Sequence, residues 1–222
     1  MTPVIGLLML ALMPAAAPLR EVQAGMVFDS QLEHFTQLAM EGKTQDAVAF
    51  LRQPGFMMAV DGEGHTALFA AAVACNTDVL DQVLARAPQL NHRDKHGATA
   101  LFYAASQGRN DVLHRLIRHG ADVNLPDASG KTPLIVAVMM NHPPAVKVLL
   151  DAGAEIDRQD ADGGTALLDA VEAGRLELAQ MLLKHGANPL LARNNGTTPI
   201  QAARGTSNPK MVNLLRREDS QF

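Results

Sequence analysis

Two histidines form the closest approach to a metal-binding pair in the sequence. His92 and His96 are four residues apart, a spacing that on a helix would place both imidazoles on one face, where a transition metal could bind. They flank a predicted hairpin instead, so we interpret them as solvated residues near its turn. Cys75 is the single cysteine, which excludes an intrachain disulfide and a zinc site built on paired cysteines. The sequence therefore predicts neither a metal nor another cofactor.

Catalytic signatures are also missing. The chain has no Gly-x-Ser-x-Gly elbow, no phosphate-binding loop, no Rossmann glycine pattern and no His-Glu-x-x-His. Asn195-Gly196-Thr197 matches a glycosylation sequon, but Asn-Gly is typical of turns. We therefore predict that the protein is not an enzyme. An enzyme or metal-binding protein, resting on scattered histidines alone, is kept as the third hypothesis.

The composition indicates a folded protein that binds neither nucleic acid nor anionic membranes. Of 222 residues, 47% are hydrophobic and 19% charged, with 19 basic against 23 acidic side chains and a net charge of −4. This balance lacks the excess positive charge that phosphate-rich partners require. There is no Trp and one Tyr, so the core must be mostly aliphatic.

The first two dozen residues resemble a targeting segment. An apolar run of ten residues extends from Val4 to Met13 and is broken by Pro14. It is too short to span a bilayer but suits the hydrophobic region of a signal peptide. No Lys or Arg precedes the run, and the cleavage point stays open between Ala17 and Ala24. We predict a signal peptide over residues 1–24 and a periplasmic or secreted protein with no membrane contact after cleavage. The alternative is an uncleaved tail or a first helix that caps the fold.

A repeat with a period of about 33 residues dominates the remainder of the chain. Four residue types recur at one fixed interval and in fixed order, and they form these columns: Gly64, Gly97, Gly130, Gly163 and Gly196; Thr66, Thr99, Thr132, Thr165 and Thr198; Leu68, Leu101, Leu134, Leu167 and Ile200; Ala71, Ala104, Ala137, Ala170 and Ala203. Aspartates lie three residues before the first four glycines. Such periodicity is the signature of a stacked repeat architecture.

Each column has a structural reason. The glycine supplies a positive φ at a hairpin tip, and the threonine caps a following helix. The Leu and Ala columns are three apart and share one helix face. Gly108 and Gly174 end this first helix, with Cys75 and Asn141 in the equivalent slot. A second apolar helix follows, so the unit is hairpin, helix, turn, helix, and its faces are covered only when units stack.

These residues resemble the ankyrin repeat, most clearly in G-A-T-A-L-F-Y-A-A-S-Q-G-R-N-D-V-L (97–113) and R-H-G-A-D-V-N (118–124). The resemblance implies an all-α ankyrin-repeat solenoid of helix-turn-helix pairs with β-hairpin fingers over 25–222, in about six repeats: 30–63, 64–96, 97–129, 130–162, 163–195 and 196–222. The first repeat is degenerate and is traced by Phe35, Leu38, Gly42, Val48, Phe50 and Leu51.

The sequence departs from the family at one position. The family's His after the Thr-Pro-Leu step is replaced by Phe69, Phe102, Ile135, Leu168 and Gln201. Hydrogen bonds that this His makes between repeats must therefore be lost or replaced by packing.

The resemblance also implies a non-enzymatic protein-binding role on the concave side, which is made by the fingers and first helices. Carried over by column, the predicted partner-binding residues form a basic, an apolar and an acidic section: Arg93, Lys95, His96, Tyr103, Gln107, Lys131, Met139, Met140, Asp162 and Glu172. Tyr103 and the Met139-Met140 pair are the expected apolar anchors. The alternatives are that the methionines fill gaps between helices and that the charges are a solvated rim.

We therefore expect a monomeric, exported interaction protein that binds another protein, in the periplasm of a bacterium. The second hypothesis is a secreted effector, or an inhibitor of the immunity-protein type, that uses the same surface.

Overall fold

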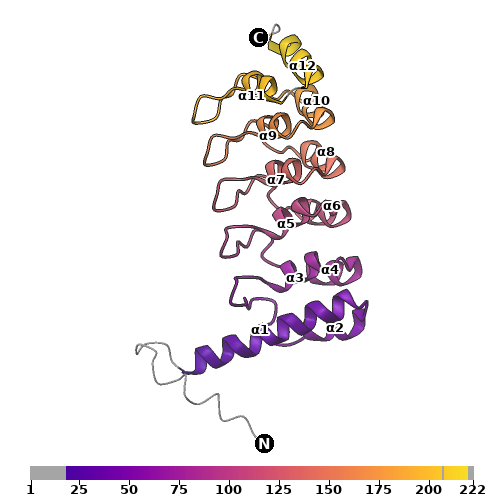
Figure 1. Cartoon of the computed structure of the whole chain (residues 1–222). Helices are drawn as coiled ribbons and strands as arrows, with labels where there is room; N and C mark the ends of the chain where they lie inside the picture. The colour runs from indigo at the N-terminus through magenta and orange to yellow at the C-terminus, as the bar shows by residue number, and fades with distance from the viewer. Residues whose placement is uncertain (1–18, 207, 220–222) are drawn as a thin grey trace, which may run out of the picture.

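The protein is a single-file stack of helix pairs (Figure 1). The computed structural model describes residues 19–206 and 208–219, with the side chains of 28–206 and 208–216. Within these residues there are twelve α-helices and no strand: α1 (Leu19–Met40), α2 (Thr44–Phe50), α3 (Ala67–Val73), α4 (Thr77–Leu84), α5 (Ala100–Ser106), α6 (Asn110–Arg118), α7 (Pro133–Met139), α8 (Pro143–Asp151), α9 (Ala166–Glu172), α10 (Leu176–Lys184), α11 (Pro199–Gly205) and α12 (Pro209–Asp219). The predicted all-α repeat solenoid is confirmed.

The threonine column starts the first helix of each pair, as predicted. Thr66, Thr99, Thr132 and Thr165 each accept a hydrogen bond at Oγ1 from the amide three residues later, at 3.2 to 3.4 Å. An N-cap of this kind satisfies one of the amides that a helix start leaves without an intrahelical partner. At the start of α11 the side chain of Gln201 contributes to the cap, because its Oε1 accepts a hydrogen bond from the Thr198 amide at 3.0 Å.

The turn between paired helices requires a left-handed residue. Gly108 and Gly174 have φ of 66° and 67°, and the non-glycine residues in the same slot, Cys75 and Asn141, both have φ of 59°. Asn tolerates this conformation better than other side chains, whereas Cys75 adopts it under strain. Ala87 has φ of 49° because it lies where later repeats place a glycine to end the second helix.

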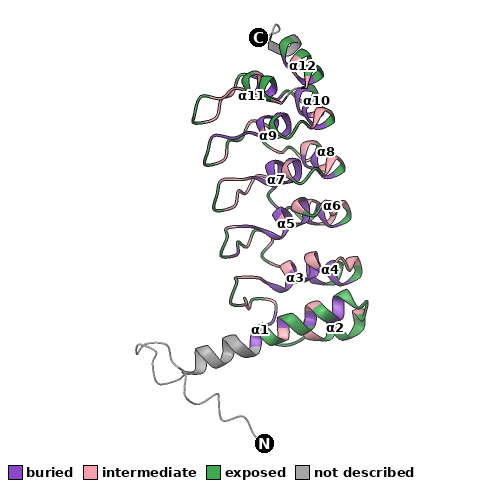
Figure 2. Cartoon of the chain, viewed as in Figure 1, coloured by how far each residue is buried: buried purple, intermediate pink, exposed green. Residues whose placement is uncertain are grey.

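The core runs the length of the stack between two rows of helices. The odd-numbered helices contact one another in series, and the even-numbered helices form the second row. The Leu and Ala columns lie at the centre, where Leu68, Leu101, Leu134 and Leu167 are at most 2% exposed. Purple residues therefore follow both rows in Figure 2. A single repeat does not enclose a hydrophobic core of its own, so the helix pairs must stack to bury their apolar faces.

The fingers are tight turns built on the aspartate column. Asp61, Asp94, Asp127 and Asp160 each donate their amide to the carbonyl four residues later, and each Oδ1 accepts from the amides two and four residues later. The carboxylate thus takes up amides that a longer hairpin would pair across strands. The predicted fingers are present as turns, and within the described residues none of them contains the paired strands of a β-hairpin.

Adjacent fingers are joined by one backbone hydrogen bond each. The amides of Lys95, Ala128, Ala161 and Asn194 donate to the carbonyls of Glu63, His96, Ser129 and Asp162, at 2.8 to 3.0 Å. A second link was not predicted: the side chains of Asn91, Asn124 and Asp157, which occupy one column of the repeat, accept from the amides of Asp122, Glu155 and Asn188 at 2.8 to 2.9 Å.

A third set of hydrogen bonds between repeats is made by side chains outside the column where the family has its histidine. Asn76, His142 and Arg175, also in one column, reach back to the carbonyls of Ala39, Ser106 and Val138 at the end of the preceding first helix. At the histidine position itself, Ile135 and Leu168 are fully buried. Packing has therefore replaced polar contact there, while other columns make the hydrogen bonds between repeats.

The first pair differs from the others because α1 has 22 residues where the equivalent helices have seven. Phe35, Leu38, Val48 and Leu51 are buried as the degenerate first repeat predicts. Of the predicted signal peptide, residues 1–18 lie outside those the structure describes, and residues 19–24 are the first six of α1. Among the described helices, none combines the length and apolar character needed to cross a bilayer.

Candidate functional site

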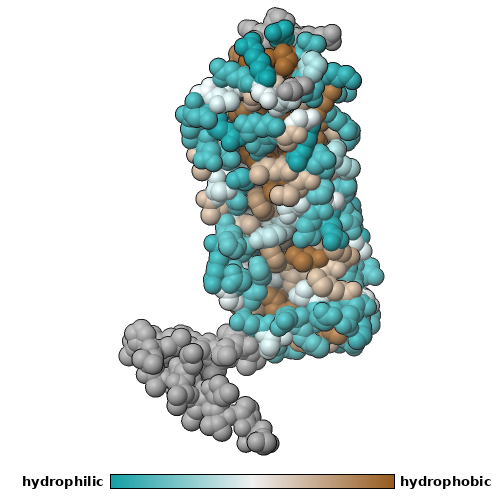
Figure 3. Space-filling model, viewed as in Figure 1, coloured by the Kyte–Doolittle hydropathy of each residue, from teal (hydrophilic) through white to brown (hydrophobic). Residues whose placement is uncertain are grey.

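All ten predicted partner-binding residues lie in the fingers, in the odd-numbered helices or at the ends of those helices. We call the side of the stack formed by these elements the finger face (Figure 1). Figure 3 shows apolar side chains on this stack in separate patches between polar ones. Some of the ten side chains make hydrogen bonds or ion pairs within the protein, and others are exposed to solvent.

The basic section is smaller than predicted. Arg93 donates from Nε to the Gly97 carbonyl at 2.8 Å and from Nη2 to the Pro126 carbonyl at 2.7 Å. It therefore joins two repeats, as Gln159 does two repeats later through the carbonyls of Gly163 and Ala192. Lys95 and His96 are exposed, and Lys95 Nζ lies 3.7 Å from Glu63 Oε1. These two side chains are the accessible part of the section.

The two histidines considered as a metal-binding pair have different surroundings, beginning with His92. Its Nε2 bonds the Gly64 carbonyl at 2.9 Å and the ring is half-buried, so the expectation of a solvated residue was wrong. His96 is exposed as expected. Within the described residues, no three His, Cys, Asp or Glu side chains are grouped to hold a metal ion.

The two methionines of the apolar section have different surroundings. Met139 is half-buried and packs against the core, so it fills a gap between helices. Met140 is 50% exposed at the end of α7. Gln107 is exposed at the end of α5, and Lys131 is half-buried, with Nζ 3.2 Å from Ser129 Oγ.

The acidic section contains a contact that the sequence did not reveal. Arg193 Nη2 lies 3.0 Å from Glu172 Oε2 and 3.1 Å from Asp169 Oδ1. Burial raises the pKa of Asp169 to about 6, opposed by the Arg193 charge and reinforced by Asp160 and Glu172. Glu172 is therefore paired within the protein, whereas Asp162 is exposed. Arg193 stands in the column where earlier fingers have aspartate, which was the available signal.

Near the other end of the finger face, aromatic and acidic side chains form one connected group, which we call the aromatic–acid cluster (His65, Phe69, Tyr103, Asp61 and Asp94). The ring of His65 stacks on Phe69 with centroids 4.0 Å apart, and Phe69 meets Tyr103 edge-on at 4.5 Å. His65 Nδ1 lies 3.0 Å from Asp61 Oδ2, and Tyr103 donates to Asp94 Oδ2 at 3.0 Å. The rings are therefore held in fixed orientations.

Tyr103 was predicted as an apolar anchor, but its hydroxyl binds a buried carboxylate. Asp94 is 8% exposed. Burial, and then the hydrogen bond and charge of Asp94, raise the pKa of Tyr103 to about 12. The sequence signal for this group was the aromatic ring of His65 in a column that otherwise holds Ala98, Lys131, Gly164 and Thr197.

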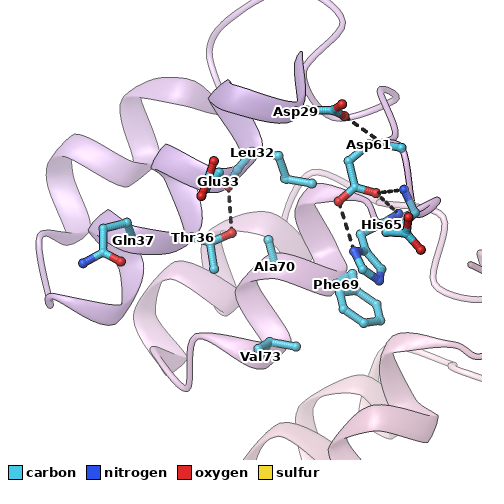
Figure 4. Close-up of a pocket in the computed structure, with 12 residues that line it drawn as sticks. Asp29, Leu32, Glu33, Thr36, Gln37, Asp61, His65, Phe69, Ala70 and Val73 are labelled. Atoms are coloured by element: carbon cyan, nitrogen blue, oxygen red, sulfur yellow. Dashed lines mark hydrogen bonds and ion pairs between the residues drawn. The ribbon is translucent and has the colours of Figure 1, made fainter. Parts of the chain in front are cut away.

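A groove of about 580 Å³ lies beside the cluster, between α1 and α3 (Figure 4). Its volume is within the range of about 300–1,000 Å³ typical of ligand sites. Leu32, Phe69, Ala70 and Val73 contribute apolar lining, and carboxylates surround them. An arrangement of this kind can receive a side chain from outside. The sequence did not predict it.

Comparison with known families gives one match. A family model described as ankyrin repeats (3 copies) matches residues 35–127, 76–160 and 153–221, which together extend from residue 35 to residue 221. A search of curated proteins found no significant match.

Proposed function

The chain belongs to the ankyrin repeat family, and on that premise we propose that its finger face binds another protein, in the periplasm of a bacterium. Ankyrin repeats generally mediate protein–protein interaction, and the family is typically non-enzymatic. The proposal assigns that role to the exposed residues of this face and places it after export.

The observation that carries the proposal is the rigidity of the finger face. Each finger is bonded to the next through its backbone, and Arg93 and Gln159 add side-chain links. The backbone that carries exposed side chains such as Lys95 and Asp162 is thus held in place from one finger to the next. A preformed surface loses little conformational entropy when it binds, so more of the contact energy appears as affinity.

A charge-reversal variant tests the proposal. Lys95→Glu with Asp162→Lys keeps the net charge and changes two exposed residues of the finger face. The matched control is Lys184→Glu with Glu177→Lys, two exposed residues of α10 in the other row. Partners are captured by crosslinking in native cells and quantified by mass spectrometry. We expect at least tenfold less of the main partner with the first variant and unchanged capture with the control. Equal capture by both would contradict the proposal.

The location is a separate part of the proposal and has its own test. The apolar run before Pro14 supports export, and the alternative is a secreted effector or inhibitor that uses the same face. Native cells are fractionated and the mature N-terminus is read by mass spectrometry. Protein found in the envelope with a cleaved N-terminus supports the periplasmic assignment. Protein found in the medium supports the effector, and an intact N-terminus in the cytoplasm refutes both.

A further inference from the structure

We infer that the groove between α1 and α3 binds a segment of a partner protein that presents a large apolar side chain next to a Lys or Arg. The inference rests on the proposed protein-binding function and goes beyond it, because it fixes where a partner docks and by which chemistry.

The groove exists because, within the described residues, the first repeat has a long helix where later repeats have a finger. In later repeats a first helix of seven residues follows its finger, whereas α1 continues through that position for 22 residues. On the facing helix the residue at the floor is Ala70, and the same column holds Tyr103 one repeat later. The small side chain leaves open a space that Tyr103 occupies in α5.

The floor and wall of the groove are apolar and fixed in place. Leu32 is 3% exposed, and the hydroxyl of Thr36 donates to the Leu32 carbonyl at 2.7 Å, so it is already satisfied within the helix. Phe69 is held between His65 and Tyr103 by ring contacts. An apolar side chain entering the groove would therefore lose water-exposed area without reordering these residues.

The charge around this floor has one sign. Four of the twelve lining residues are Asp or Glu, and none is Lys or Arg. Asp29 and Asp61 are engaged by the Gly62 amide and by His65. Glu33 is exposed and makes no ion pair within the described residues, and Glu63 is 59% exposed with Lys95 at 3.7 Å. Glu33, together with the exposed Glu63 that a partner's basic residue would share with Lys95, complements a basic residue adjacent to an apolar one.

Two other occupants of the groove are alternatives to a partner segment. The chain's own residues 1–18 are apolar but contain no Lys or Arg, so they bring no basic side chain to Glu33 and Glu63. A second copy of the chain would produce a dimer, which the test below detects.

The test begins with a phage-displayed library of random dodecapeptides panned against the full chain. Enriched peptides are synthesised with fluorescein and titrated by fluorescence anisotropy. The first variant, Glu33→Lys with Glu63→Lys, reverses the charge at the rim. The matched control, Asp78→Lys with Glu177→Lys, changes net charge equally at exposed positions on α4 and α10. A second variant, Ala70→Tyr, fills the floor with the residue found at the next repeat.

We expect enriched peptides with Lys or Arg beside Leu, Ile, Met or Phe. Their affinity should fall at least tenfold with the rim variant and with Ala70→Tyr, stay within twofold in the control, and weaken as NaCl rises from 50 to 500 mM. Circular dichroism checks that Ala70→Tyr folds. If it does not, the peptide affinity of the rim variant alone tests the inference.

Three outcomes would overturn the inference: no enrichment, enriched peptides without basic residues, or affinities indifferent to the rim charge. A wild-type dimer in sedimentation that the rim variant dissociates would assign the groove to a second copy instead. These failures are distinct from failure of the proposed function, which depends on partner capture through Lys95 and Asp162.

Discussion

Asp29 accepts a hydrogen bond from the Gly62 amide at 2.8 Å, and this contact ties the long helix α1 to the first finger. In the later fingers, the amides in the same column as Gly62 each donate to a backbone carbonyl of the preceding finger; they belong to Lys95, Ala128, Ala161 and Asn194. In the part of the chain that the structure describes, α1 and not a finger precedes the first finger. A carboxylate from a helix therefore takes the place of the missing carbonyl.

Removing this carboxylate should loosen the first finger alone. In Asp29→Ala the Gly62 amide loses its acceptor, at a cost of about 1 kcal/mol for an exposed site. We expect several-fold faster hydrogen exchange at Gly62 and no change at Lys95, whose acceptor is the Glu63 carbonyl. Asp29→Asn keeps an acceptor oxygen and should retain most of the protection. Unchanged exchange at Gly62 in Asp29→Ala would show that the contact is not formed.

The asparagine column between repeats should contribute measurably to global stability. Asn124→Ala leaves the Glu155 amide without its side-chain acceptor, and we expect the free energy of unfolding to fall by about 1–2 kcal/mol. Asn124→Asp is the control, because Asp157 makes the same contact one repeat later. Urea denaturation measures both. Equal loss in the two variants would show that the acceptor oxygen is not the source of the stability.

Relieving the strained turn at Cys75 should stabilise the protein. The residue has φ of 59°, which glycine adopts without the steric cost that a Cβ imposes. Cys75→Gly is therefore expected to exceed Cys75→Ala by about 1 kcal/mol in the free energy of unfolding, although both remove the thiol. Thermal and urea denaturation report the difference. The ranking would have to be abandoned if the alanine variant proved equally stable.

Tyr103 is the only tyrosine, so its ionisation can be followed directly by absorbance near 295 nm. Burial and the contact with Asp94 raise its pKa to about 12, whereas the unfolded chain should titrate near 10. Stability from this group is thus present below pH 10 and lost as the pH rises through 12. We expect the native protein at pH 11 to keep Tyr103 protonated and the urea-unfolded protein to ionise it. Asp94→Asn should lower the native value without restoring 10, because burial remains. A folded protein that titrates near 10 would refute the assignment.

Asp169 should make stability depend on pH in the opposite sense from an ordinary salt-bridged carboxylate. Burial raises its native pKa to about 6 from 3.8, so between these values the native state holds a proton that the unfolded state has released. Its contribution is present below pH 4 and is lost as the pH rises through 6. We expect wild type to lose about 1–3 kcal/mol relative to Asp169→Asn between pH 4 and 7. Urea unfolding at several pH values compares the two, and a flat difference would contradict the raised pKa.

The sequence determined the repeat architecture because its cause is local. A cap at Thr99, a left-handed turn at Gly108 and an apolar face at Leu101 each depend on residues within one turn or one helix. When such features recur from repeat to repeat, the same backbone recurs, and stacking covers its faces. The location of the finger face followed from that register.

The tertiary structure alone decided which side chains on that face are free. Arg93 and Glu172 were expected to bind a partner, yet they contact the Pro126 carbonyl and Arg193, 33 and 21 residues away. The groove beside Ala70 depends on the length of α1, which no repeat column encodes. Periodicity fixes where a backbone position lies, but whether a long polar side chain reaches solvent or a neighbour depends on the particular residue opposite it in the next repeat.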